Sequence, residues 1–229
     1  KFGRSMIRLK NSSLVAAQGQ VAGELCIERK SGEDSGVFTS REWLDANRLG
    51  SHASSTLCEA HNRKYHGLLV AAPEGRGKHV LLSRLDGELV LGDTVHPLST
   101  SYFPGAVAPD GWRLLESFRL GPAPAWEWAG PVSRAPHPAA GPSWRLTRSL
   151  MLMQASNTLL LRYEYTGPQA SLRLRPFLAY RDMHRLTREN ALLNPAVHRE
   201  LLGVRFDPYE GLPPLWLTWT SVGSFAERP

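Results

Sequence analysis

Two short polar clusters hold the residue types most able to do chemistry. The first is "HNRKYH" at 61–66, which stands directly against the apolar run at 67–72, and the second is "RDMH" at 181–184. Imidazole, guanidinium, phenol and carboxylate groups can bind a metal, transfer protons, contact nucleic acid or hydrogen-bond the hydroxyls of a sugar. For the first cluster, an ordinary turn leading into a buried strand is the alternative interpretation.

Metal, nucleophilic and phosphate chemistry find little support in the spacing of these residues. His61 and His66 are five positions apart, and no His-x-His or His-Glu-x-x-His motif occurs. The chain has no Gly-x-Ser-x-Gly, and "EGRGK" at 74–78 lacks the spacing of a phosphate-binding loop, so it indicates a surface turn. We therefore expect no metal site and no cofactor.

Glycoside hydrolysis requires two carboxyl groups at a defined separation, which a sequence does not provide. Asp182 and Glu189 are near neighbours in the chain, as are Asp207 and Glu210, but a solvated surface role is the simpler interpretation of each. No catalytic pair is assigned on this ground.

Sugar binding uses exposed aromatic faces, and two tryptophan pairs are candidates. In a strand, Trp126 and Trp128 of "WEW" share one face, whereas Trp216 and Trp219 of "WLTW" lie on opposite faces. Tryptophan is also highly buried on average, so we expect both pairs to belong to the core.

The charge balance is basic, with a formal net charge of +6 and a pI near 9.6. The basic residues are scattered along the chain, and "RKYH" at 63–66, which combines basic and aromatic groups, has no counterpart elsewhere. A basic β-sandwich that binds nucleic acid remains the alternative function, although we expect no nucleic-acid partner.

The elements that position these groups follow a period of two. At 157–166, Leu159, Leu161, Tyr163 and Tyr165 fall on one face and charged residues on the other. In 79–91, Asp86-Gly87 between two apolar runs predicts a tight hairpin turn. A helix is suggested only at 186–202. Further strands are expected at 20–28, 67–72, 112–120, 144–153, 170–178 and 215–221. Pro176 predicts an edge or a bulge in the strand at 170–178.

Many short strands with little helix predict an all-β fold, a large antiparallel β-sandwich or a barrel, as a single domain over 1–229. No apolar run is long enough to cross a membrane, and the first ten residues lack the apolar core of a signal peptide. Cys26 and Cys58 are isolated in the sequence, which indicates two reduced, buried thiols and a cytoplasmic protein.

Two longer stretches resemble a known family. They are "EWLDANRLGSHASSTLCEAHNRKYHGLLVAA" at 42–72 and "PFLAYRDMHRLTREN" at 176–190. Both are similar to the N-terminal domain of bacterial and archaeal glycogen debranching enzymes. The matching positions are Glu42, Trp43, Leu44, Asn47, Leu49, Gly50, Arg63 or Lys64, Tyr65, His66, Gly67, Leu68, Leu69, Arg181, Asp182 and His184.

The resemblance implies a β-supersandwich that accompanies an enzyme hydrolysing α-1,6-linked glucose at the branch points of glycogen (an amylo-α-1,6-glucosidase). Its catalytic carboxylates would lie in a helical (α/α) barrel that follows this domain, and no long helical pattern precedes Pro229. We therefore expect an accessory domain that is inactive alone, with α-glucan and the C-terminal barrel as partners. The glucan-contacting residues are expected to be Arg63, Tyr65, His66, Arg181, Asp182 and His184.

Overall fold

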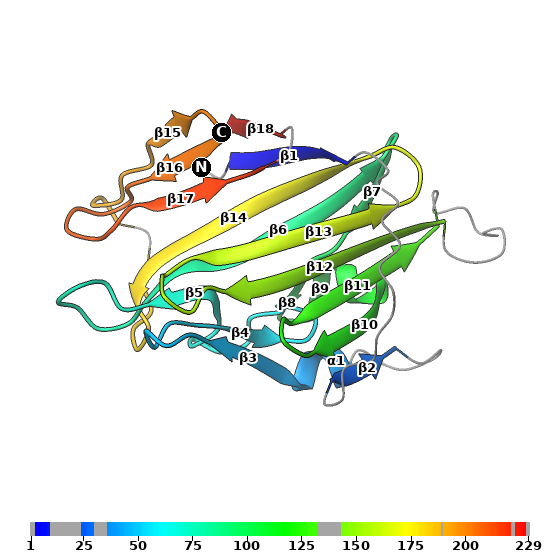
Figure 1. The fold of residues 1–229 in the computed structure, drawn as a ribbon, viewed down its shortest axis with the longest axis horizontal. Helices are drawn as coiled ribbons and strands as arrows, with labels where there is room; N and C mark the ends of the chain where they lie inside the picture. Colours follow the sequence, from blue (N-terminus) through cyan, green and yellow to red (C-terminus); the bar gives the residue numbers. More distant parts are fainter. Residues whose placement is uncertain are drawn as a thin grey trace.

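The chain folds into two antiparallel β-sheets packed face to face, with almost no helix (Figure 1). The computed structural model describes residues 3–9, 24–29, 36–131, 143–188, 190–220 and 223–227. The expected all-β sandwich is confirmed, and the barrel alternative is not adopted.

The larger sheet has eight strands. Seven follow one path in the order β18-β1-β14-β6-β5-β4-β3, and β7 pairs with β6 beside that path. In that order the strands are β18 (Gly223–Glu227), β1 (Gly3–Leu9), β14 (Ala170–Asp182), β6 (His79–Leu91), β5 (Gly67–Ala71), β4 (His52–Thr56), β3 (Glu42–Ala46) and β7 (Thr94–Pro97).

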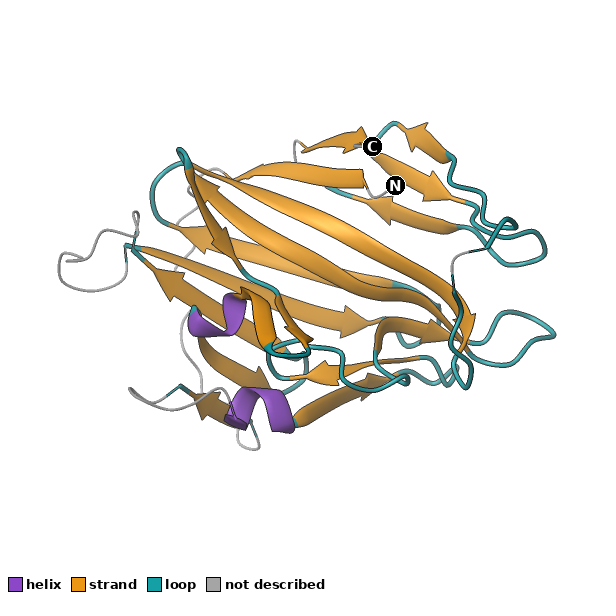
Figure 2. Cartoon of the chain, turned by 180° about the vertical axis from the view of Figure 1, so that it is seen from behind, coloured by secondary structure: helices purple, strands orange, loops and turns teal. Residues whose placement is uncertain are grey.

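The second layer is a five-stranded sheet in the order β13-β12-β11-β10-β2. Its strands are β13 (Leu159–Thr166), β12 (Trp144–Leu152), β11 (Ala125–Gly130), β10 (Leu115–Leu120) and β2 (Leu25–Glu28). The remaining elements are β8 (Thr100–Phe103), β9 (Ala106–Asp110), β15 (Val197–Glu200), β16 (Gly203–Phe206), β17 (Leu215–Thr218), the helix α1 (Gly36–Ser40) and the 3-10 turn η1 (Gly111–Arg113). Strands β15 to β17 form a small sheet that lies near both chain ends, and the helical turns lie on the side seen in Figure 2.

The core fills the space between the two large sheets, because alternate residues of each strand point inward. Trp126, Trp128 and Trp144 are buried here, so the expectation that "WEW" belongs to the core is confirmed. Trp43 and Phe118 contact Trp126 edge to face, with ring centroids 5.0 and 5.2 Å apart.

The clearest period-two predictions are confirmed. In β13 the face of Leu159, Leu161, Tyr163 and Tyr165 turns to the core, and the intervening residues are exposed. In β14 the register shifts directly after Pro176, between Phe177 and Leu178, and β1 pairs only with residues 170–174. The proline therefore lies beside a bulge and at a point where β14 is no longer paired with β1. Both positions suit proline, because it has no backbone N–H to donate to a neighbouring strand.

The hairpin turn expected at Asp86-Gly87 is wrong, because both residues lie inside the continuous strand β6. Gly87 is a glycine for packing reasons, since an added Cβ would lie 3.2 Å from a methyl group of Leu98. The hairpin of β6 with β7 turns instead at Gly92-Asp93, where Leu91 pairs with Thr94 and Gly92 has a positive φ of 54°.

The helix suggested at 186–202 is also wrong. The described part of this segment is loop up to residue 196, followed by β15 from Val197. Pro195 removes a backbone donor, and Asn194 bonds to Asp207 and Pro208 across the loop. Of the strand expected at 20–28, residues 20–23 lie outside the described residues.

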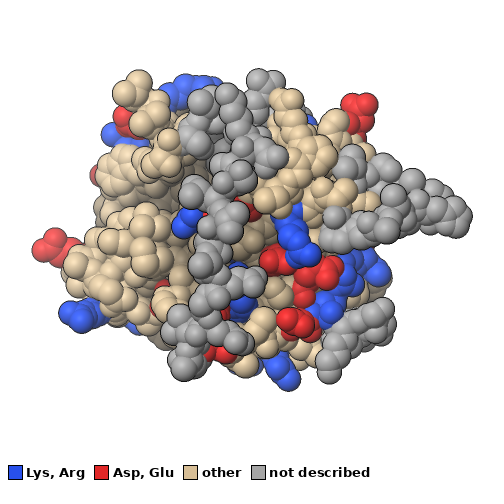
Figure 3. Space-filling view, turned by 45° about the vertical axis from the view of Figure 1, so that its right-hand side comes forward, with Lys and Arg blue, Asp and Glu red and all other residues tan. Residues whose placement is uncertain are grey.

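Both cysteines are free, as expected, but only Cys58 is buried and Cys26 is exposed. On the face shown in Figure 3, acidic and basic side chains lie side by side, and that face presents no continuous basic field. Among the described residues, no helix is both long and apolar enough to cross a membrane.

Candidate functional site

The fold brings the two polar clusters together at one end of the larger sheet. Residues 61–66 lead into β5, and β14 ends at Asp182 opposite His79, the first residue of β6. Contacts of Lys64 with Arg181 and of Lys64 and Tyr65 with His184 show that the loop before β5 lies against the turn after β14. Segments about 120 positions apart in the sequence thus form one surface.

Arg181 joins the two segments through backbone carbonyl groups. Its Nη2 donates to the carbonyl oxygen of Lys64. Its Nη1 lies 3.3, 3.4 and 3.1 Å from three carbonyl oxygens of the turn that follows it, those of Asp182, Met183 and Arg185. The planar guanidinium suits such a fixed set of acceptors. Arg181 therefore holds both loops in place, and its contact with a glucan stays a prediction.

Tyr65, His184 and Lys64 form the exposed part of this surface. The rings of Tyr65 and His184 meet edge to face with centroids 5.6 Å apart, and the phenol oxygen lies 3.4 Å from His184 Nδ1. Lys64 Nζ donates to the His184 carbonyl oxygen at 3.2 Å and lies 5.1 Å from the Tyr65 ring centre. These three side chains remain open to a ligand while their positions are restrained.

His66 and Arg63 are held by Glu42 on the edge strand β3. Glu42 Oε1 lies 2.6 Å from Arg63 Nε and 3.5 Å from His66 Nε2. His66 is 4% exposed, so its ring packs behind the surface, whereas Arg63 remains 65% exposed. Of this pair, only Arg63 is open to a ligand.

Asp182 and His184 are two positions apart and would share one face of a strand, but β14 ends at Asp182 and His184 lies in the turn beyond it. The Asp182 carboxylate instead accepts a hydrogen bond from the His184 backbone N–H at 2.7 Å. This bond, ahead of the nearby His184, His79 and Arg185, lowers the pKa of Asp182. Asp182 therefore stays ionised and shapes the turn.

His61 is half-buried beside His66. Its ring is 5.6 Å from that of His66, and Ser83 Oγ lies 3.5 Å from its Nδ1. Burial, followed by the charges of His66, Arg84 and Arg181, lowers the pKa of His61 to about 3. His61 Nε2 and His66 Nδ1 are buried and have no hydrogen-bond partner among the described residues.

Burial of neutral His61 should make the stability of the chain depend on pH. Its pKa is about 3 when folded and about 6.5 when unfolded, so between these values only the unfolded chain binds the proton. We expect the free energy of unfolding to be independent of His61 protonation above pH 6.5. Below that pH, proton binding to His61 in the unfolded chain should lower it by at most about 1.4 kcal/mol per pH unit. Urea unfolding from pH 5 to 8 measures this slope, to which the lowered pKa values of His52 and His66 also contribute.

In the His61→Gln variant, the free energy of unfolding should change less steeply with pH, because one proton fewer binds on unfolding. This difference in slope is expected whatever the stability of the variant at pH 8. A variant slope equal to that of the unchanged chain would contradict the burial of a neutral His61.

Two contributors to this surface, Glu42 and Lys64, were not among the expected site residues. Glu42 stands in the first motif of the family resemblance, which was the available signal for it. Lys64 contributes a carbonyl oxygen that accepts from Arg181 and an ammonium group that donates to His184. Any residue type has a backbone carbonyl group, so the sequence could not indicate the first of these contacts.

The described residues contain no group of three or more His, Cys, Asp or Glu side chains placed to bind one metal ion. Burial raises the pKa of the Asp86 carboxyl group. Asp86 lies against Arg84 in the middle of β6, away from the surface formed by Tyr65 and His184.

A family model described as glycogen debranching enzyme N terminal matches residues 41–229. Since the match spans most of the chain, this chain belongs to that family. Neither the comparison with curated proteins nor the comparison with solved structures gave a match.

Proposed function

We propose that this chain is the accessory, glucan-contacting domain of a cytoplasmic glycogen debranching enzyme that acts on α-1,6 branch points. The observation that carries the proposal is the exposed pair of Tyr65 and His184, held at the end of the larger sheet in a chain of this family. An aromatic face beside imidazole and ammonium groups suits a neutral polyhydroxyl ligand, through apolar ring contact and hydrogen bonds.

The electrostatics of the surface support a binding role rather than catalysis. A glycosidase needs a general acid whose pKa is raised, beside a second carboxylate. Here the pKa of Asp182 is lowered, and Glu42 is paired with Arg63. We therefore propose that hydrolysis belongs to a catalytic helical barrel of the same polypeptide, and that this domain packs on the barrel and extends the Tyr65 surface toward the glucan.

Affinity electrophoresis in gels containing glycogen tests this proposal. Tyr65→Ala and His184→Ala should each weaken retardation about fivefold, because each removes a contact of about 1 kcal/mol. Tyr102→Ala is the matched control, since Tyr102 is 42% exposed and Tyr65 is 40% exposed, and it should migrate like the unchanged chain.

Unchanged retardation of both variants, at an unchanged thermal midpoint, would remove this surface from glucan binding. Glucose release from a branched dextrin by the chain alone would overturn the assignment of catalysis to the barrel. The rival function, a nucleic-acid-binding sandwich, would gain support if the chain bound DNA with an affinity that falls steeply with salt and did not bind maltooligosaccharides.

A further inference from the structure

The outer face of the small β15–β17 sheet carries a row of side chains that the fold does not need. His198, Arg205 and Trp216 are direct neighbours across the three strands. Trp216 is 54% exposed, which corrects the expectation that it belongs to the core. Trp219 turns to the other side and packs with Val204 and Phe206.

The inner face alone anchors this sheet. Val204 and Phe206 are buried and pack against Leu178 of β14 and against Leu217. Because the hydrophobic contacts of the sheet are made on this side, exposure of the indole on the other side has no folding role. Among the described residues, the Trp216 side chain has no hydrogen bond, ion pair or ring contact.

Polar groups beside Trp216 are held ready on the same face. Asp207 Oδ2 lies 3.0 Å from Arg205 Nε and 3.3 Å from His198 Nε2. The backbone of Asp207 is itself fixed, because its carbonyl oxygen accepts from Asn194 Nδ2 at 3.1 Å. The two terminal nitrogens of Arg205 have no partner among the described residues, so they remain available as donors.

The charges of this patch favour a neutral ligand. The positive charge of Arg205 is compensated by Asp207. A second carboxylate, Glu200, lies on the same face, two positions after His198 in β15. A polyanion requires uncompensated basic groups, which this patch does not offer. A flat exposed indole with a neighbouring donor and acceptor instead suits the apolar face and the hydroxyl groups of a pyranose ring.

We infer that the outer face of the β15–β17 sheet is a second carbohydrate-binding surface, with α-glucan as its ligand. Trp216 stacks on a glucose ring, and Arg205, Asp207 and His198 bind its hydroxyl groups. The choice of α-glucan rests on the proposed function, but the residues are separate from Tyr65 and His184. Two surfaces on one domain would hold a branched polymer by simultaneous contacts.

Titration of the 229-residue chain with maltohexaose, followed through its tryptophan indole N–H signals, tests the inference directly. The Trp216 signal is identified by its loss in Trp216→Phe. We expect it to shift on addition of the sugar and to shift equally in high salt. An unmoved Trp216 signal at the highest sugar concentration, or equal movement with a duplex DNA that salt abolishes, would overturn the inference.

Affinity electrophoresis in glycogen separates this surface from the first. Trp216→Ala should weaken retardation about tenfold, Trp216→Phe should weaken it less, and Arg205→Met should also weaken it. All three are expected to keep the thermal midpoint, because the substituted side chains lie outside the core. If Trp216→Ala changes nothing while Tyr65→Ala weakens binding, the second surface is excluded and the proposed function stands. If only the Trp216 variants weaken binding, the second surface stands and the Tyr65 surface is excluded.

Discussion

Replacing Arg148 with methionine should lower the free energy of unfolding by about 3–5 kcal/mol. Arg148 is 3% exposed in β12 and forms an ion pair with Glu59, which is 10% exposed. Its guanidinium also lies 4.3 Å from the ring centre of Trp126 and 5.4 Å from that of Trp128. Removal of Arg148 leaves a buried carboxylate without its counter-charge, which costs far more than the loss of one contact.

The environment of Arg148 supports a charged pair in the core. Burial acts to lower the pKa of Arg148, but Glu59 and then Tyr163 outweigh it and raise the pKa. Glu59 adopts a positive φ of 61°, a conformation that costs a non-glycine residue about 1–2 kcal/mol. The turn between β4 and β5 therefore accepts backbone strain at the residue whose carboxylate enters the core.

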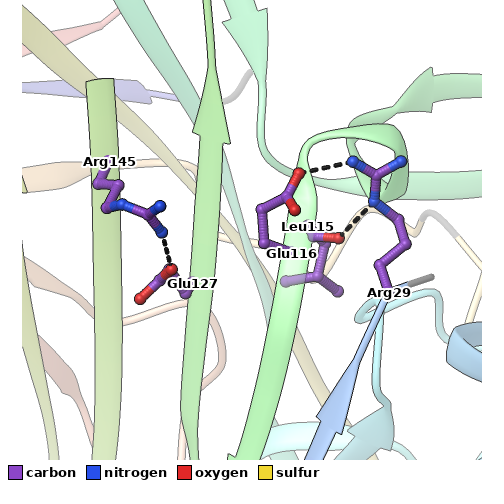
Figure 4. A network of polar contacts seen from close by, with 5 residues as sticks. All are labelled: Arg29, Leu115, Glu116, Glu127 and Arg145. Carbon is purple, nitrogen blue, oxygen red and sulfur yellow. Dashed lines mark hydrogen bonds and ion pairs between the residues drawn. The ribbon is translucent and has the colours of Figure 1, made fainter. Parts of the chain in front are cut away.

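Arg145 provides the matched control for this variant. It lies three positions away on the same strand and forms an ion pair with Glu127 on the outer face (Figure 4). Arg145 is 50% exposed, so Arg145→Met should cost no more than about 1 kcal/mol. Urea unfolding at pH 7 compares the two, and equal losses would contradict a special role of burial at Arg148.

A double variant tests the pairing itself. Glu59→Gln with Arg148→Met removes both charges, so its loss should be smaller than the sum of the two single losses. Additive losses would mean that the two side chains stabilise the core independently.

Replacing Trp126 with alanine should also cost about 3–5 kcal/mol, the range for a large aromatic side chain in a packed core. Trp126 is fully buried, its Nε1 donates to the Leu57 carbonyl oxygen at 2.8 Å, and it contacts Trp43 and Phe118 edge to face. The substitution leaves a cavity between the sheets and a carbonyl group without its partner.

Trp216→Ala is the natural comparison, because it removes the same side chain from an exposed position. It should change the free energy of unfolding by less than about 0.5 kcal/mol. Both variants can be measured by urea unfolding followed by far-ultraviolet circular dichroism. A loss at Trp216 as large as that at Trp126 would mean that the small sheet depends on its outer face.

The fold class was readable because burial between two sheets imposes a period of two on every strand. In β13 the alternation of apolar and charged residues predicted which side chains face the core, and the same rule placed Trp126 and Trp128 together. The family motifs independently pointed to the same architecture. These signals are local, so the sequence carries them without reference to a partner strand.

The predictions that failed depended on contacts with distant segments. Asp86-Gly87 has the composition of a tight turn, but β14 and Leu98 lie along this stretch and keep β6 extended through it. The helix suggested at 186–202 was displaced by pairing of β15 with β16 and by the loop contacts of Asn194. Tertiary pairing outweighed local propensity in both places.

The sequence by itself determined the two-layer sandwich, the family and the composition of both polar clusters, because periodicity and motifs are properties of neighbouring residues. Only the tertiary structure decided which members of the clusters are exposed. His66 turned behind the surface, Arg181 was directed to carbonyl oxygens, and Tyr65 met His184. The physical reason is that exposure and hydrogen-bond partners depend on strand pairing across more than a hundred residues, and no local pattern records that pairing.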